Sequence, residues 1–194
     1  MIAPAPPAAG EPAPGPRDPF RRRVVTLVVG VVVVALVLVG LTVGGGPGPD
    51  ARAAAFSLPR LGGGTRVGFP LAGDDAHHPV VLTFFASWCG PCHRDLPVVA
   101  AVARAAAARH SPVVFLGIDG NDGTAAGLAF ARASGVGFAV GADSGSVVAP
   151  RYTLVGYPGT VFIDRAGDVV HTVQGPVSRA TLSTWLDRIA GSPA

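Results

Sequence analysis

Residues 53–194 are expected to form an α/β domain, because two features recur along this stretch. Runs of β-branched and aromatic residues, typical of strands, alternate with longer Ala-rich runs typical of helices, and Gly, Pro and Asp separate them. We predict strands at residues 80–85, 113–118, 138–140, 159–164 and 168–174. Helices are predicted at residues 91–109, 124–134 and 178–189, with a helical turn before Tyr152. Pro97 lies inside the first helix and is expected to kink it, since proline has no amide donor.

A charge-free run of apolar and small residues, 24–43, precedes the domain. A helix of this length crosses a hydrocarbon core of about 30 Å, so the run is predicted to span a membrane. Arg21, Arg22 and Arg23 precede it, and the positive-inside rule therefore puts the N-terminus in the cytoplasm. A cleaved signal peptide is the alternative, because the residues around Ala53 resemble a cleavage site. However, a signal h-region is usually shorter, about 7 to 15 residues.

Two further segments flank the predicted span. Residues 1–23 are rich in Pro and Ala and end in the Arg cluster, which predicts a disordered cytoplasmic tail. Residues 44–52 are rich in Gly and Pro, which predicts a flexible linker. The chain is therefore expected to be a single-pass protein of the cell membrane, with residues 53–194 as an extracytoplasmic domain.

The charge of the chain does not point to a polyanionic partner. All fifteen basic residues are Arg, and four of them precede the span together with two of the twelve acidic residues. Eleven basic and ten acidic residues remain in the rest of the chain. No basic patch is predicted, so nucleic acid is not an expected partner.

The two cysteines of the chain, Cys89 and Cys92, lie at the junction of a predicted strand and a predicted helix. The first turn of a helix has unpaired N–H groups and a partial positive charge, which stabilise the reactive thiolate. Cys89 is therefore the predicted nucleophile, and Cys92 is the predicted resolving thiol. Two other interpretations are weaker. A structural zinc site usually needs a second ligand pair, and a structural disulfide that closes so short a loop adds little stability.

Three stretches of the chain resemble one known family. They are Ala86 to Cys92 (ASWCGPC), Asp95 to Pro97 (DLP) and Gly156 to Asp164 (GYPGTVFID). Together they resemble the thioredoxin superfamily and, within it, the membrane-anchored extracytoplasmic thiol-disulfide oxidoreductases of the TlpA, ResA and DsbE type. The resemblance covers residues 56–189.

This resemblance has consequences for the fold. It implies a thioredoxin-like fold, with a central mixed sheet flanked by helices, after one N-terminal transmembrane helix. Residues 123–140 resemble the extra helix-strand insertion of that group. No organic cofactor is expected beyond the redox-active Cys89–Cys92 disulfide.

The same resemblance assigns residues around the dithiol. Pro158 is expected to be a cis-proline opposite the cysteines, with an ordinary trans turn proline as the alternative. Tyr157, Trp88, Gly90 and Pro91 are expected to contact the substrate. For Trp88, ordinary packing of a large apolar ring is the competing interpretation.

The proton chemistry departs from that of cytoplasmic thioredoxins, which carry a buried Asp six residues before the nucleophile. Thr83 occupies that position here, and a hydroxyl is not a base near neutral pH. The resemblance points instead to Asp95, three residues after Cys92 and on the same helical face, as the group that helps to move a proton from Cys92. An acid that is merely stabilised by the helix N-terminus is equally compatible with the sequence. His93 is expected to face solvent.

The expected function is the reduction of protein disulfides, because Gly90 and Pro91 form the dipeptide of thioredoxin, which is strongly reducing. The resemblance implies a transmembrane thiol carrier as electron donor and apocytochrome c as one substrate. Three alternatives stay open. They are an extracytoplasmic oxidase that introduces disulfides, a peroxidase, and a metal or haem chaperone that uses the dithiol as ligands. The spacing of the cysteines counts against the last two.

Overall fold

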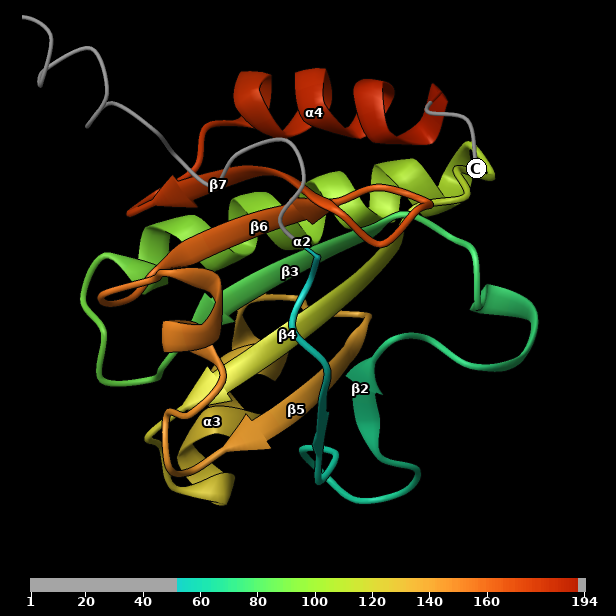
Figure 1. Cartoon of the computed structure of the whole chain (residues 1–194). Coiled ribbons are helices and arrows are strands. Elements are labelled where there is room, and N and C mark those ends of the chain that lie inside the picture. Colours follow the sequence, from blue (N-terminus) through green and yellow to red (C-terminus); the bar gives the residue numbers. More distant parts are fainter. Residues whose placement is uncertain (1–51, 192–194) are drawn as a thin grey trace, which may run out of the picture. The chain divides into compact units, whose positions relative to one another are not determined.

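The computed structural model describes residues 52–191, which are built around a five-stranded sheet (Figure 1). Its strands are β3 Val80–Phe85, β4 Val114–Gly120, β5 Ala139–Asp143, β6 Gly159–Ile163 and β7 Val169–Gln174. A separate two-stranded sheet consists of β1 Phe56–Leu58 and β2 Val67–Phe69. The helices are α2 Cys92–Ala108, α3 Thr124–Ala133 and α4 Arg179–Gly191, with two 3-10 helices, η1 Gly73–Asp75 and η2 Ala149–Tyr152.

The strand order of the large sheet is β5-β4-β3-β6-β7. Strands β3, β4 and β5 are parallel, while β6 and β7 are antiparallel to their neighbours. Helices α2 and α3 make the two parallel crossovers, which step in the same direction across the sheet. Right-handed crossovers therefore put both helices on one face. The carboxyl ends of β3, β4 and β5 meet at one edge, where these connections begin.

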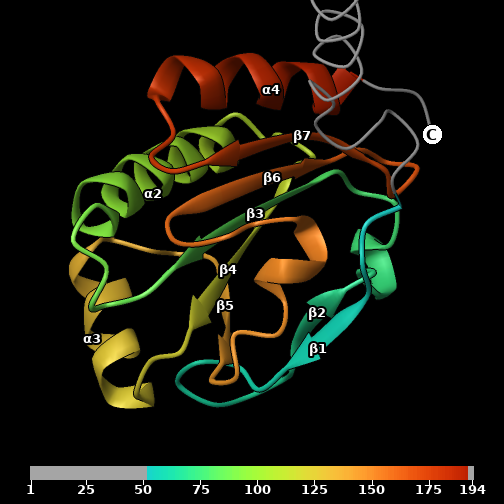
Figure 2. The same ribbon diagram turned by 60° about the vertical axis from the view of Figure 1, so that its left-hand side comes forward.

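Helices α2, α3 and α4 lie on one face of the sheet, here called the helical face (Figures 1 and 2). The pair β1–β2 and the short η2 cover the opposite face, here called the hairpin face. The expectation of a mixed sheet is confirmed. The three α-helices, however, all lie on the helical face. For α2 and α3 the reason is that both parallel crossovers run the same way.

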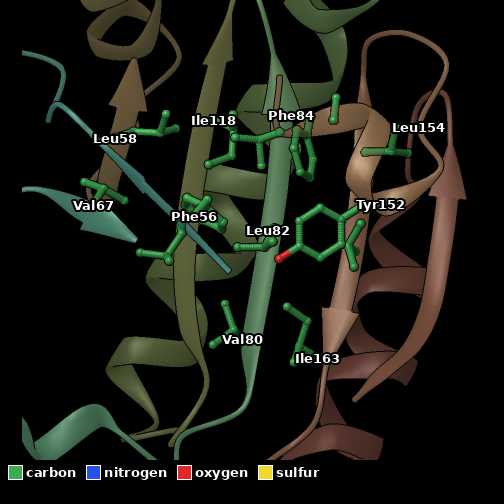
Figure 3. Close-up of a cluster of buried hydrophobic side chains, with 14 of the residues drawn as sticks. Phe56, Leu58, Val67, Val80, Leu82, Phe84, Ile118, Tyr152, Leu154 and Ile163 are labelled. Carbon is green, nitrogen blue, oxygen red and sulfur yellow. The ribbon is translucent and has the colours of Figure 1, made fainter. Parts of the chain in front are cut away.

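Strand β3 is buried throughout and separates two cores. Side chains alternate along a strand, so Leu82 and Phe84 point to the hairpin face while Val81 and Phe85 point to the helical face. Figure 3 shows the hairpin-face core, in which the labelled side chains of β1, β2, η2 and the sheet pack together. A strand buried on both faces is expected to be a nearly continuous apolar run, as β3 is.

The predicted strands are all present, with small differences at their ends. Strand β4 extends two residues beyond the predicted end and includes Asp119, and β5 extends to Asp143. Helix α2 continues through Pro97, and its kink stays a prediction. The pair β1–β2 was not predicted, because three-residue strands carry too little alternation to be recognised and are stabilised here by packing on the sheet.

The predicted tail and membrane span, residues 1–23 and 24–43, lie outside the described residues. Within residues 52–191, no helix is both long and apolar enough to cross a membrane. Arg52 and Ala53 already belong to the folded part, since the Ala53 N–H donates to the Gly167 carbonyl at 2.9 Å and Arg52 forms an isolated bridge with Asp168.

Candidate active site

The two cysteines lie between the end of β3 and the first turn of α2, as predicted. They form a disulfide, with their Cα atoms 5.3 Å apart. Cys92 is the first residue of α2, and Pro91 before it already has the helical values φ −60° and ψ −30°. The helical geometry of Pro91 therefore brings the two sulfurs to the start of the helix.

The surroundings of the two sulfurs differ. The Cys92 backbone N–H donates to Cys89 Sγ at 3.3 Å, which is within range for a hydrogen bond to sulfur. Cys89 is 4% exposed, whereas Cys92 is fully buried. In the reduced state, the same N–H and the helix N-terminus would stabilise a thiolate on Cys89.

The aromatic residues expected around the site come together from distant parts of the chain. The rings of Trp88 and Tyr157 meet edge to face, with their centroids 5.8 Å apart. The peptide bond between Tyr157 and Pro158 is cis, as the resemblance implied. Tyr157 also packs against the apolar cluster that contains both cysteines. The loop that carries Pro158 therefore lies beside the dithiol, while a role in substrate contact stays a prediction.

Tyr157 is held in place at its hydroxyl. The hydroxyl is 2.9 Å from Ser146 Oγ, in the loop after β5. A Cβ atom at Gly120 would lie 1.8 Å from the Tyr157 hydroxyl oxygen, so only glycine leaves room at the end of β4. Burial raises the pKa of Tyr157, which keeps the hydroxyl protonated.

The space in front of the dithiol is open. Gly90 is exposed, and a Cβ atom added there would have no atom within 4 Å. The same is true of Gly156, just before Tyr157. Trp88 is 59% exposed beside them. Free space therefore adjoins Gly90, next to Cys89, and Gly156, next to Tyr157.

Asp95 lies in the first turn of α2, and its side chain is buried. Its Oδ1 accepts a hydrogen bond from the Val177 N–H, which precedes α4, at 2.6 Å. Burial raises the pKa of Asp95 to about 6, and the Val177 bond opposes this shift. A carboxyl group with this pKa can exchange a proton near neutral pH, as the predicted role requires. The transfer of a proton from Cys92 to Asp95 itself stays a prediction.

Thr83 stands on the helical face of β3 and is fully buried. Its partner across the β3–β6 pair is Thr160, which is also fully buried. Neither hydroxyl has a hydrogen-bond partner among the described residues. The position held by an acid in cytoplasmic thioredoxins therefore carries a neutral polar side chain here.

Three polar residues of the site, Ser87, Asp119 and Asp122, were not predicted to have a role there. Ser87, Asp122 and His93 are joined by hydrogen bonds just before Cys89, and the buried Asp119 lies behind Asp122. His93 is exposed as expected, but its Nε2 is 2.9 Å from the Ser87 carbonyl oxygen. Asp119 and Asp122 follow the apolar part of β4, and such acids at the carboxyl end of a parallel strand are a recognisable signal.

Within residues 52–191, no group of three His, Cys, Asp or Glu side chains is placed to hold a metal ion.

Comparisons with known proteins agree with this geometry. The model of the AhpC/TSA family matches residues 49–172. The thiol-disulfide oxidoreductase ResA from Bacillus thuringiensis is 24% identical over 110 residues, which are 57% of this chain and 62% of ResA. The chain thus spans about three fifths of the length of this curated relative.

Two solved structures are also similar. DsbF from Mycobacterium tuberculosis is 31% identical with a TM-score of 0.58, and the match covers 69% of this chain and 94% of DsbF. The thioredoxin domain of a thiol-disulfide oxidoreductase from Bacteroides vulgatus has a TM-score of 0.61 at 16% identity, covering 74% of this chain and 99% of that domain. The chain therefore has a thioredoxin-like α/β fold and belongs to the AhpC/TSA family.

Proposed function

We propose that this protein is a thiol-disulfide oxidoreductase that exchanges its Cys89–Cys92 pair with disulfides and dithiols of other proteins. The observation that carries the proposal is the disulfide at the start of α2, in which Cys89 Sγ accepts the Cys92 N–H. The thiol-disulfide oxidoreductase ResA, a relative of this chain, is named for the same chemistry.

The exposure of the two cysteine residues supports their roles. Cys89 retains some exposure while Cys92 has none, so an incoming disulfide meets Cys89 first. The Cys89 thiolate attacks one substrate sulfur and forms a mixed disulfide, and the other substrate sulfur leaves as a thiolate and takes up a proton. Cys92 then loses its proton and attacks Cys89 Sγ, which re-forms the Cys89–Cys92 disulfide and releases the substrate as a dithiol.

The proposed function includes a direction of the redox reaction and a location of the domain in the cell. Reduction of protein disulfides fits the Gly90–Pro91 dipeptide, which is that of the reducing thioredoxins. The apolar run at residues 24–43 supports an anchor that keeps the domain on the outer side of the cell membrane. A reductase there needs electrons from a transmembrane thiol carrier, and apocytochrome c is one substrate class to test.

A trapping experiment tests the reaction. In the full-length protein, Cys92→Ser should accumulate mixed disulfides at Cys89, because nothing remains to resolve them. Cys89→Ser is the control and should form none of these adducts. The absence of covalent adducts with Cys92→Ser, while the wild-type protein carries an intact disulfide, would contradict the proposed exchange.

The reduction potential tests the direction. A value near or below about −270 mV in dithiothreitol buffers places the protein with reducing thioredoxins. A value of about −120 to −180 mV makes it an oxidase or isomerase instead. Turnover of hydrogen peroxide with a thiol donor would favour a peroxidase.

A further inference from the structure

The segment just before Cys89 is tied to the loop that follows β4. The Ser87 N–H donates to Asp122 Oδ2 at 2.6 Å, and the Ser87 hydroxyl lies 2.9 Å from Asp122 Oδ1. The next residue, Trp88, donates its indole N–H to the Asn121 carbonyl oxygen at 2.9 Å. Two neighbouring residues of this loop thus hold the two residues that precede the nucleophile.

A third contact comes from α2. His93 Nε2 lies 2.9 Å from the Ser87 carbonyl oxygen, and the His93 ring packs on Phe130 of α3 at a centroid distance of 4.5 Å. The amide and the carbonyl of Ser87 are therefore both bound, from two different elements. Such a residue has little freedom to rotate, and neither has the chain that leads from it to Cys89.

Asp122 is itself backed by a buried carboxyl group. Asp119 at the end of β4 is 2% exposed, and a Cβ atom at Gly127 of α3 would lie 1.9 Å from Asp119 Oδ2. Burial raises the pKa of Asp119 to about 7, and the charge and hydrogen bond of Asp122 add to this shift. A proton on Asp119 near neutral pH reduces the repulsion between the two side chains.

The contacts of Ser87 and Trp88 can control the position of Cys89 Sγ relative to the Cys92 N–H. Cys89 Sγ accepts the Cys92 N–H at 3.3 Å. A hydrogen bond weakens steeply as its geometry departs from linear, so a small rotation of the preceding turn would remove this stabilisation of the thiolate.

We propose that Asp122 is a positioning residue for the dithiol, whose carboxylate holds Ser87 so that Cys89 Sγ faces the N-terminus of α2. This inference rests on the proposed function, because it concerns the reactivity of the same cysteine. It assigns a role to an acid that lies thirty-five residues from its partner Ser87 in the sequence.

Alkylation of Cys89 measures this role directly. The reduced full-length protein is treated with iodoacetamide between pH 5 and pH 9, and modification of Cys89 is followed by mass spectrometry. Asp122→Ala leaves the Ser87 N–H without its acceptor and should slow alkylation at pH 7 about tenfold, with a raised thiol pKa. Asp122→Asn keeps an acceptor for this N–H and should stay within about twofold of the wild type. Thr124→Ala, an exposed change two residues further on, is the matched control and should leave the rate unchanged.

An effect of the Asp122 charge and a positioning role of Asp122 predict different alkylation rates. If Asp122 acted only through its negative charge, both variants would change the thiol pKa equally, and they would lower it. An equal change in both variants, or a rate for Asp122→Ala within twofold of the wild type, overturns the proposal. If Asp122→Ala does not fold, Ser87→Ala removes only the hydroxyl contact, and its alkylation should slow about threefold. A change below about twofold for Ser87→Ala then overturns the proposal.

Alkylation does not require disulfide exchange, so the two proposals fail separately. A wild-type protein that forms no mixed disulfides, with Asp122→Ala still slow to alkylate, contradicts the proposed function alone. Normal exchange together with unchanged alkylation in Asp122→Ala contradicts the positioning role alone.

Discussion

Buried carboxyl groups on the two faces of the sheet differ in their hydrogen bonding. Towards the hairpin face, Asp143 at the end of β5 accepts hydrogen bonds from the Val147 and Val148 N–H groups at 3.1 and 2.9 Å. On the helical face, Asp95 accepts one bond, from Val177. Oδ1 of Asp119, on the same face, has no partner among the described residues.

The two acids of the helical face have fewer donors to keep a buried carboxyl group charged. Backbone N–H donors favour the charged form of a buried carboxyl group, whereas burial without enough donors favours the neutral form. Burial accordingly raises the pKa of Asp95 to about 6 and that of Asp119 to about 7. Both lie on the face that carries the dithiol, where groups that titrate near neutral pH are useful.

The largest expected loss of stability is at Asp143. Asp143→Ala leaves two backbone N–H groups without their acceptor and should lower the free energy of unfolding by roughly 2–4 kcal/mol. Urea denaturation of the oxidised protein measures it. Ser144→Ala, an exposed change in the same turn, is the control and should stay within about 0.5 kcal/mol of the wild type. Equal effects of the two changes would mean that Asp143 does not anchor this turn.

Asp119 should have the next largest effect, and it should depend on pH. Its folded-state pKa is raised, so the folded state holds a proton that the unfolded state loses between about pH 4 and pH 7. The free energy of unfolding should therefore fall as pH rises through this window. Asp119→Asn removes this titration and should be more stable than the wild type at pH 8 by about 1–3 kcal/mol. Lower stability of Asp119→Asn at pH 8 would contradict the raised pKa.

Asp95 should also make the free energy of unfolding depend on pH, over a narrower pH range than Asp119 and by a smaller amount. Its pKa is raised to about 6, so its contribution to stability falls between about pH 4 and pH 6 and then stays constant. Asp95→Asn keeps an acceptor for the Val177 N–H and should gain about 1–2 kcal/mol above pH 6. The slope between pH 6 and pH 7 should persist in Asp95→Asn and disappear in Asp119→Asn. Unfolding curves at half-unit pH steps distinguish the two acids.

The smallest effect is expected at the exposed rim of the dithiol. Trp88→Phe removes the hydrogen bond to the Asn121 carbonyl but keeps an aromatic ring against Tyr157. Trp88 is largely exposed, so water replaces the lost bond and stability should fall by less than about 1 kcal/mol. Thermal unfolding of the oxidised protein measures it, and a larger fall would show that the indole supports the buried core.

Several elements were predictable from the sequence because their signals are local. Strand β3 is apolar except for Thr83, and α2 is long and rich in Ala. The positions of Cys89 and Cys92 at their junction follow from these two elements alone. The end of β4 was predicted less well. Its last two residues are Asp119 and Gly120, and Asp and Gly are uncommon in strands, so the sequence pattern placed them in a loop.

What the sequence determined by itself is the dithiol, its place at a strand-to-helix junction and the α/β class, since each depends on neighbouring residues. Only the tertiary structure decided which distant groups surround Cys89. The contacts of Asp122 with Ser87, of Trp88 with Tyr157 and of Asp95 with Val177 join elements that are far apart in the chain. They arise because the ends of β3, β4, β5 and β7 and the start of β6 lie at one edge of the sheet, and side-chain burial there depends on packing that no local pattern encodes.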